Sequence, residues 1–292
     1  MLAQQLVNGL VVGSIYALFA LGFTLMFGVL GVINLTYGFY LSIGAFLALY
    51  ATQHGVSIWL ALPLAALACG LIAMLVDGVL LTPLRRAKAP ELASLMVTLG
   101  ATLLLYSLAN AALSTDIRRF PPGVIDGSAI DLMGVRVTLT QCLIVASAGV
   151  LVAALLWLMN GSRLGMGLRA LAERPDTAAL MGVNAGALVR LVSMISGALA
   201  GACGVLIGLN YKAIQPYMGE VMMLKGFAVI ILGGLGDIRG ALVAGLIVGL
   251  LETLTAGYVA SSIKDGVGFA LLVLTLWIRP SGLFGRIAVK RA

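Results

Sequence analysis

The side chains that most often carry out enzyme chemistry are sparse in this sequence and wrongly spaced for it. His54 is the single histidine, which excludes an H-E-x-x-H zinc site and any site with several histidine ligands. Residues 161–165 read G-S-R-L-G rather than the G-x-S-x-G of a serine nucleophile, and no G-x-x-x-x-G-K-[ST] phosphate loop occurs. We therefore expect no catalytic residue, no metal site, no cofactor and no ATP-binding site of the chain's own.

Three charged residues stand inside apolar sequence and are the remaining candidates for chemistry: Asp77, Lys225 and Glu252. A charge isolated in hydrocarbon is costly, so such residues usually pair with each other, reach an interface or line a polar path. Asp77 lies about two helical turns before Arg85 and Arg86, which can neutralise it. We expect pairing first, with a polar path or proton coupling as the alternatives.

The elements that position these residues must be membrane helices. Hydrophobic residues make up 61% of the 292 residues and charged residues 10%, and the mean hydropathy is +1.12. Soluble domains carry about 25% charged residues, so this chain cannot cover a water-facing surface. The net charge of +7 comes from basic loops between apolar runs, which indicates membrane orientation rather than nucleic-acid binding.

A bilayer core about 30 Å thick takes about 20 helical residues to cross. The sequence predicts an all-α, polytopic transmembrane bundle that forms one domain over residues 1–292, with eight to nine spans. The expected spans are residues 6–28, 36–52, 58–82, 92–113, 138–159, 188–208, 220–236, 240–259 and 264–280. Spans formed by strands are excluded because the apolar runs are too long and lack two-residue alternation.

Two segments favour broken or re-entrant helices. Polar residues and glycines interrupt the first 52 residues, and the short segment 220–236 ends in three glycines within four residues. Irregular backbone at membrane depth is tolerated only beside protein or water, and it often lines transport sites. A solute path is therefore expected along Asn34, Thr36, Tyr37, Ser42, Gly233, Gly234 and Gly236. The alternative is that these residues only cap and pack helices.

Three basic clusters can share the cytoplasmic side if nine spans run from an external N-terminus. They are the loop 83–91, the loop 160–187 with Arg190 just beyond it, and the C-terminal tail. Eight crossings, with 220–236 re-entrant, would place the tail outside, and we predict nine.

The cytoplasmic loop 160–187 is long for this membrane domain and rich in helix-forming residues. Pro175 and Asp176 suit the first turn of a short helix, and Gly182 suits its end. Such a helix lying across the cytoplasmic face predicts a contact with a partner protein, although an ordinary connecting helix would show the same spacing.

This loop resembles the coupling-helix region of the branched-chain amino-acid ABC permease family, the LivH/LivM type. The matching residues read G-x-G-x-R-A over 165–170, then Glu173, then A-x-L-x-G-V-N over 178–184. Other matches follow in order at residues 13–38, 83–86, 231–252 and 264–285, so the resemblance covers essentially the whole chain. Tyr37 departs from the pattern, because many relatives have a histidine before this glycine, and this leaves the solute open.

The resemblance implies a permease in a bacterial inner membrane that imports branched-chain or other amino acids. It implies as partners a second permease subunit, as a copy or a paralogue, two cytoplasmic ATP-binding subunits and an external solute-binding protein. By the same resemblance, the coupling contact falls on Arg169, Glu173, Pro175, Asp176, Ala179, Met181 and Gly182.

A stand-alone secondary transporter driven by protons or sodium is the alternative function. It usually needs ionisable relays within the membrane, and the few acids in these spans speak against it. A membrane-embedded enzyme is a further alternative, which lacks candidate catalytic groups.

Overall fold

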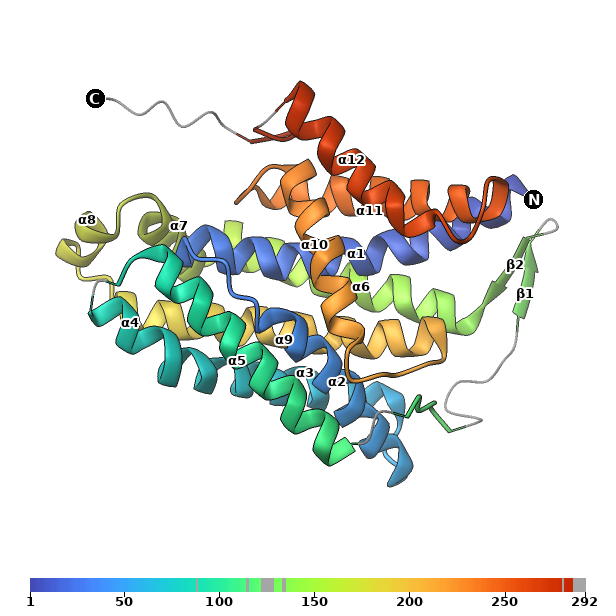
Figure 1. Ribbon diagram of the computed structural model, residues 1–292, viewed down its shortest axis with the longest axis horizontal. Helices are drawn as coiled ribbons and strands as arrows, with labels where there is room; N and C mark the ends of the chain where they lie inside the picture. The colour runs from blue at the N-terminus through green and yellow to red at the C-terminus, as the bar shows by residue number, and fades with distance from the viewer. Residues whose placement is uncertain (88, 114–115, 122–128, 133–134, 280, 286–292) are drawn as a thin grey trace.

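The protein is a bundle of helices in a computed structural model (Figure 1), which describes residues 1–87, 89–113, 116–121, 129–132, 135–279 and 281–285. The elements, in chain order, are α1 (Leu2–Leu30), α2 (Tyr37–Gln53), α3 (Ile58–Val76), the π-helical η1 (Asp77–Leu81), α4 (Thr82–Arg86), α5 (Glu91–Leu113), β1 (Ala129–Leu132), β2 (Val135–Thr138), α6 (Leu139–Gly161), α7 (Arg163–Glu173), α8 (Pro175–Leu180), α9 (Ala185–Tyr211), α10 (Met218–Gly233), α11 (Ile238–Tyr258) and α12 (Lys264–Ile278).

The long helices α1 and α9 form the centre of the bundle. In the most apolar stretch of α1 and of α9, 78% of the residues are buried, whereas 17% are buried in the corresponding stretch of α5 at the edge of the bundle. Helix α1 packs mainly on α11, and α9 packs on α2 and α3. Small residues allow this close approach: a Cβ atom added at Gly249 of α11 would lie 2.3 Å from the Cα of Gly13 in α1. Such glycine contacts are typical of helices that pack in lipid.

The helical spans follow the sequence prediction closely, but their number does not settle at eight or nine. Within the described ranges, six helices are long and apolar enough to cross a membrane: α1, the continuous run from α3 through η1 to α4, α5, α6, α9 and α11. Helices α2, α10 and α12 have 17, 16 and 15 residues. These lengths lie at or just below the lower limit of about 17 residues for a complete crossing, so the count of crossings remains a prediction.

A small β-hairpin accompanies the helices, which otherwise agree with the predicted all-α bundle. Strands β1 and β2 pair antiparallel in the loop before α6, with Asp131 opposite Arg136. The Gln4 side chain of α1 bonds to both the main-chain N–H and C=O of Arg136, each at 2.9 Å, so the hairpin edge is tied to the start of α1. The spans themselves are all helical, as predicted.

The two ends of the bundle differ in character (Figure 1). Helices α4, α7 and α8 lie at one end, whereas the N-terminus and the β-hairpin lie at the other. The described arginines of the first two basic clusters are therefore gathered at the end that carries α7 and α8. This arrangement agrees with an external N-terminus.

Candidate functional site

The end of the bundle that carries α7 and α8 presents an apolar tip to the surroundings. Helix α8 begins at Pro175 and ends at Leu180, and Gly182 follows with a φ of 83° and an N–H bonded to the Ala179 carbonyl at 3.0 Å. The short helix and its glycine end were both predicted. Leu180 is 87% exposed and Met181 81% exposed at the end of this helix. These two adjacent apolar side chains make the end of α8 a candidate contact for another protein.

Three of the residues expected at this contact, Arg169, Glu173 and Ala179, are exposed on α7 and α8. Arg169 also contacts the end of α6. Its guanidinium donates to the Met159 carbonyl and lies 3.5 Å from the Asn160 side-chain oxygen. Arg169 therefore braces α7 against the end of α6. The backbone of residues 175 and 176 belongs to α8, and their side chains lie outside what the structure describes.

The break between α1 and α2 is stabilised by its own polar side chains. Helix α1 ends at Gly31 in the left-handed conformation. The Asn34 side-chain amide oxygen accepts from the Thr36 N–H at 3.0 Å and from the Thr36 hydroxyl at 2.6 Å, and the Tyr40 hydroxyl lies 2.8 Å from the Thr36 hydroxyl. All three residues are buried. These contacts hold the irregular segment at depth, although the Asn34 amide nitrogen is left without a partner among the described residues.

The start of α2 crosses the start of α10 at very short range. The Ser42 hydroxyl accepts from the Gly219 N–H at 2.9 Å, so a side chain of α2 caps α10. A Cβ atom at Gly219 would lie 1.9 Å from the Gly38 carbonyl oxygen. Tyr37 is fully buried and donates to the Phe19 carbonyl at 3.1 Å. The two interrupted segments that the sequence singled out are therefore in direct contact.

The glycines expected on the solute path lie at the far end of α10. A Cβ atom at Gly233 would lie 2.5 Å from the Gly240 carbonyl carbon, and Gly234 and Gly236 both have positive φ. Gly236 and Arg169 line a pocket of about 410 Å³ between α1, α6, α7 and the start of α11. The residues expected on the solute path therefore lie in two places. One group is at the break before α2 and at the Gly38–Gly219 crossing, and the other is at the far end of α10, where Gly236 lines the pocket near α7.

Asp77, one of the three charges in apolar sequence, is fully buried and paired. Its carboxylate lies 2.7 Å from the Arg85 guanidinium, whose side chain is 27% exposed. Asp77 begins the π-helical turn η1. Such turns insert an extra residue into a helix and often occur at functional sites. Here the turn brings Arg85, eight residues on, back to the carboxylate.

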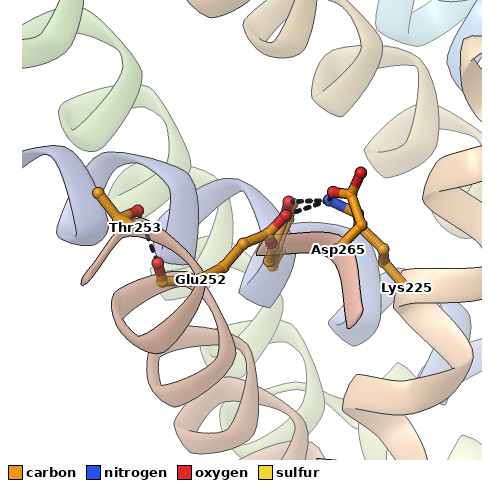
Figure 2. Close-up of polar contacts among 6 residues, drawn as sticks. Lys225, Glu252, Thr253 and Asp265 are labelled. Atoms are coloured by element: carbon orange, nitrogen blue, oxygen red, sulfur yellow. Dashed lines mark hydrogen bonds and ion pairs between the residues drawn. The ribbon is translucent and has the colours of Figure 1, made fainter. Parts of the chain in front are cut away.

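Lys225 and Glu252 form one cluster with a third residue, Asp265 (Figure 2). The Lys225 ammonium donates to Glu252, to Asp265 at 2.7 Å and to the Tyr16 hydroxyl at 2.9 Å. The Lys225 and Glu252 side chains are 11% and 6% exposed, and that of Asp265 is 55% exposed. One cation of α10 thus joins carboxylates of α11 and α12 to a hydroxyl of α1.

Three residues that sequence reasoning left unassigned also belong to these sites. Leu180 is the most exposed residue of the α8 tip, Asp265 completes the charge cluster, and Glu220 lies exposed in the first turn of α10 beside the Ser42 cap. Leu180 stands next to Met181 and could have been found from that position. No sequence signal distinguished Glu220 from an ordinary residue of a helix end.

The chemistry of these groups is that of binding and movement. Among the described residues, no group of three or more histidine, cysteine, aspartate or glutamate side chains could hold a metal ion. The buried charges pair, the buried glycines permit close helix crossings, and the most exposed apolar side chains at the α7–α8 end belong to α8.

Comparison with known proteins gives consistent matches over nearly the whole chain. Residues 5–276 match the family described as branched-chain amino acid transport system / permease component. The chain is 33% identical to the high-affinity branched-chain amino acid transport system permease protein BraD of Pseudomonas aeruginosa, over 99% of this chain and 97% of that relative. It is 31% identical to the permease protein LivH of the corresponding Escherichia coli K12 system, with the same coverage. It is 30% identical to a probable LivH permease of Methanocaldococcus jannaschii, over 95% of this chain and 91% of the relative. No solved structure is significantly similar to the chain.

Proposed function

The chain belongs to the family of branched-chain amino acid transport permease components, and from that premise we propose that it forms one half of the translocation pathway of an ATP-driven amino-acid importer. It is a multi-pass protein of the bacterial inner membrane. Its proposed partners are a second permease subunit, two cytoplasmic ATP-binding subunits and an external solute-binding protein. The proposed solute class is branched-chain amino acids, which the names of its relatives support.

The observation that carries this proposal is the exposed tip of α8. Leu180, the last of the six residues of α8, and Met181, which follows it, are 87% and 81% exposed at the α7–α8 end of the bundle. Arg169 and the buried side chains of Leu168 and Leu171 fix α7 to the bundle. A push on α8 is therefore transmitted through α7 to α6 and α1. This geometry suits a permease that is moved by a separate ATPase.

The mechanism follows from that connection. Closure of the ATP-binding subunits displaces α8, and the bundle rocks so that its pathway opens alternately to the two sides of the membrane. The pathway proposed from the sequence runs past the segment 31–42 and the glycines 233–236. The chain itself breaks and forms no covalent bond in this scheme.

The test is ATP-driven uptake of leucine into proteoliposomes that contain the chain with its ATP-binding, second permease and solute-binding subunits. We expect uptake with ATP to persist when an uncoupler collapses the proton gradient. Uptake that needs no ATP and stops with the uncoupler would instead establish an ion-coupled secondary transporter.

The coupling role of α8 is tested with Met181→Glu. A charge placed on an apolar contact is expected to lower association with the ATP-binding subunits, measured by co-purification, by about ten- to a hundredfold, because buried interface anchors contribute about 2 kcal/mol or more. Val259→Glu is the matched control, because Val259 is a similarly exposed apolar residue, at 73%, directly after α11. Equal association of both variants with the ATPase would contradict the proposed contact.

A further inference from the structure

Glu220 carries an exposed carboxylate in the first turn of α10, far along the bundle from the end of α2. Its neighbour Gly219 is bonded to Ser42, which lies eleven residues before the end of α2 at Gln53. At 1.5 Å per residue that distance is about 17 Å along the helix axis, in a hydrocarbon core about 30 Å thick. If α2 is the predicted span 36–52, which ends at the external surface, this distance places Glu220 within the hydrocarbon core.

The environment of Glu220 within one chain leaves the charge uncompensated. No described cation forms an ion pair with Glu220, whereas Asp77, Glu252 and Asp265 each contact a lysine or an arginine. A carboxylate facing lipid tails costs several kcal/mol, and charged residues at this depth face a bundle interior or a water-filled cavity. The face of α10 that carries Glu220 is therefore not a lipid-facing surface.

A pocket of about 320 Å³ lies at this face, between the start of α2, α5 and α10. This volume lies at the lower end of the range of about 300–1,000 Å³ typical of small-molecule sites. The polar residues that line it are Thr102, Tyr106, Ser107, Tyr217 and Glu220. The rest of the lining is mainly apolar and includes Leu35, Leu99, Leu103, Met223, Leu224 and Phe227. One acidic group beside a larger apolar surface suits a ligand with a cationic end and an aliphatic end.

A second observation points to a ligand in this pocket. Tyr106 is 3% exposed, and its buried hydroxyl has no hydrogen-bond partner among the described residues. The Ser42 hydroxyl lies near Tyr106 and accepts from the Gly219 amide at 2.9 Å, but the Tyr106 hydroxyl forms no hydrogen bond of normal geometry with it. A buried hydroxyl without a partner costs about 1–3 kcal/mol, so a ligand that accepts its hydrogen bond is favoured. The Tyr106 ring is held by Tyr217 and Phe39, with ring centroids 5.4 and 5.5 Å away.

We propose that this pocket, defined by Glu220, Tyr106 and the apolar side chains of α5 and α10, binds the transported amino acid within the membrane. Glu220 accepts hydrogen bonds from its ammonium group, the Tyr106 hydroxyl donates to its carboxylate, and the leucines and Phe227 contact its aliphatic side chain. This inference rests on the proposed transport function and assigns its solute site.

A second pocket beside α10, lined also by α1, α9 and the start of α12, is less suited to this role. It has about 260 Å³ and includes Lys225 and Asp265, but these two groups are already joined to each other and to Glu252. A ligand ammonium there would have to displace Lys225. Glu220 needs no such exchange.

The first experiment measures charge and water in the pocket without any need for transport. A thiol is introduced by Ser107→Cys in a Cys142→Ser background, because Ser107 and Cys142 are exposed and Cys69 and Cys203 are buried. The assembled complex is then treated with the cationic aminoethyl or the anionic sulfonatoethyl methanethiosulfonate. We expect the cationic reagent to react about tenfold faster, leucine to slow the reaction, and Glu220→Gln to remove the preference.

The second experiment measures uptake of leucine by the complete complex. Glu220→Gln is expected to lower uptake by about ten- to a hundredfold, as for loss of a charge-assisted hydrogen bond, and Glu220→Asp to restore part of it. ATP hydrolysis stimulated by the binding protein should change less than about twofold, because the α8 contact is untouched. Asp116→Asn, which removes an exposed carboxylate before the β-hairpin, is the matched control.

The outcomes separate this site from the transport proposal. Absence of ATP-driven uptake in the unaltered complex would overturn the proposed function, whereas the thiol experiment would still report on the pocket. Failure of both reagents to react at Ser107→Cys, or a cationic preference that survives Glu220→Gln, would overturn the site. Unchanged leucine uptake by Glu220→Gln would overturn it as well.

Discussion

Replacing Lys225 by methionine, Lys225→Met, is expected to destabilise the bundle by about 3–5 kcal/mol, which is the usual effect of removing one partner from a buried ion pair. Lys225 of α10 contacts Glu252 of α11, Asp265 of α12 and Tyr16 of α1, and so holds these four helices together. Methionine keeps most of the side-chain volume, so packing changes little. The effect comes from the carboxylate that is left behind.

The exposures of the two carboxylates decide the size of the effect. The Glu252 side chain is 6% exposed and becomes an uncompensated buried charge, whereas Asp265, at 55%, is solvated from outside. Hydrogen bonds between membrane helices average about 0.6 kcal/mol, so loss of the Tyr16 contact alone is a minor part. Asp265→Asn should therefore cost about 1 kcal/mol or less, the usual value for exposed pairs.

The assay is the thermal midpoint of the detergent-solubilised protein, followed by loss of the monodisperse peak in size-exclusion chromatography. At about 2–4 °C per kcal/mol, Lys225→Met should lower Tm by about 6–20 °C and Asp265→Asn by less than about 4 °C. The double variant Lys225→Met with Glu252→Gln removes both buried charges and should recover most of the loss.

Two results would refute this reasoning. If Asp265→Asn lowered Tm as much as Lys225→Met, exposure would not govern the cluster. If the double variant were as unstable as Lys225→Met, the loss would come from packing rather than from the carboxylate of Glu252.

The remaining predictions concern close contacts, reactivity and backbone conformation. Gly219→Ala should cost about 1–3 kcal/mol or prevent assembly, because its Cβ atom would meet the Gly38 carbonyl, whereas Gly149→Ala, with open space around it, should leave the yield of monodisperse protein unchanged. N-ethylmaleimide should label one thiol per folded chain, at the exposed Cys142, and all three after denaturation; mass spectrometry that found labelled Cys69 or Cys203 before unfolding would contradict the packing. Gly182→Val should raise the backbone energy by about 1–3 kcal/mol, because Gly182 has a φ of 83°, and should lower the amount of uptake per ATP hydrolysed. An unchanged ratio of uptake to ATP hydrolysis in the variant would show that the end of α8 is not needed for coupling.

The helical spans could be predicted because hydrocarbon imposes its demands residue by residue. Each span must be apolar and must satisfy its backbone hydrogen bonds internally, so long apolar runs such as 92–113 and 138–159 appear as α5 and α6 with bounds shifted by no more than two residues. The α8 helix was predictable for the same local reason, since Pro175 and Gly182 mark its start and the turn that ends it.

The pairings between distant helices could not be predicted, because they depend on how the helices pack. Lys225 and Glu252 were each expected to find a partner, but only the tertiary structure brings them together with Asp265, 40 residues from Lys225. Arg169 was expected at a partner contact, which stays a prediction, and only the tertiary structure shows that it also reaches Met159, because α7 folds back against α6. Glu220 stood unassigned because its depth depends on the crossing of α2 and α10.

The sequence by itself determined that this chain is a membrane protein, the approximate bounds of its helices, and which of its loops carries a short helix. These properties follow from composition and local preference, which act over a few residues. Only the tertiary structure decided which charges are neutralised, which buried hydroxyl is left without a partner and which carboxylate faces an open pocket. Those outcomes depend on the distances between side chains far apart in the chain, and distances of that kind are set by the packing of whole helices.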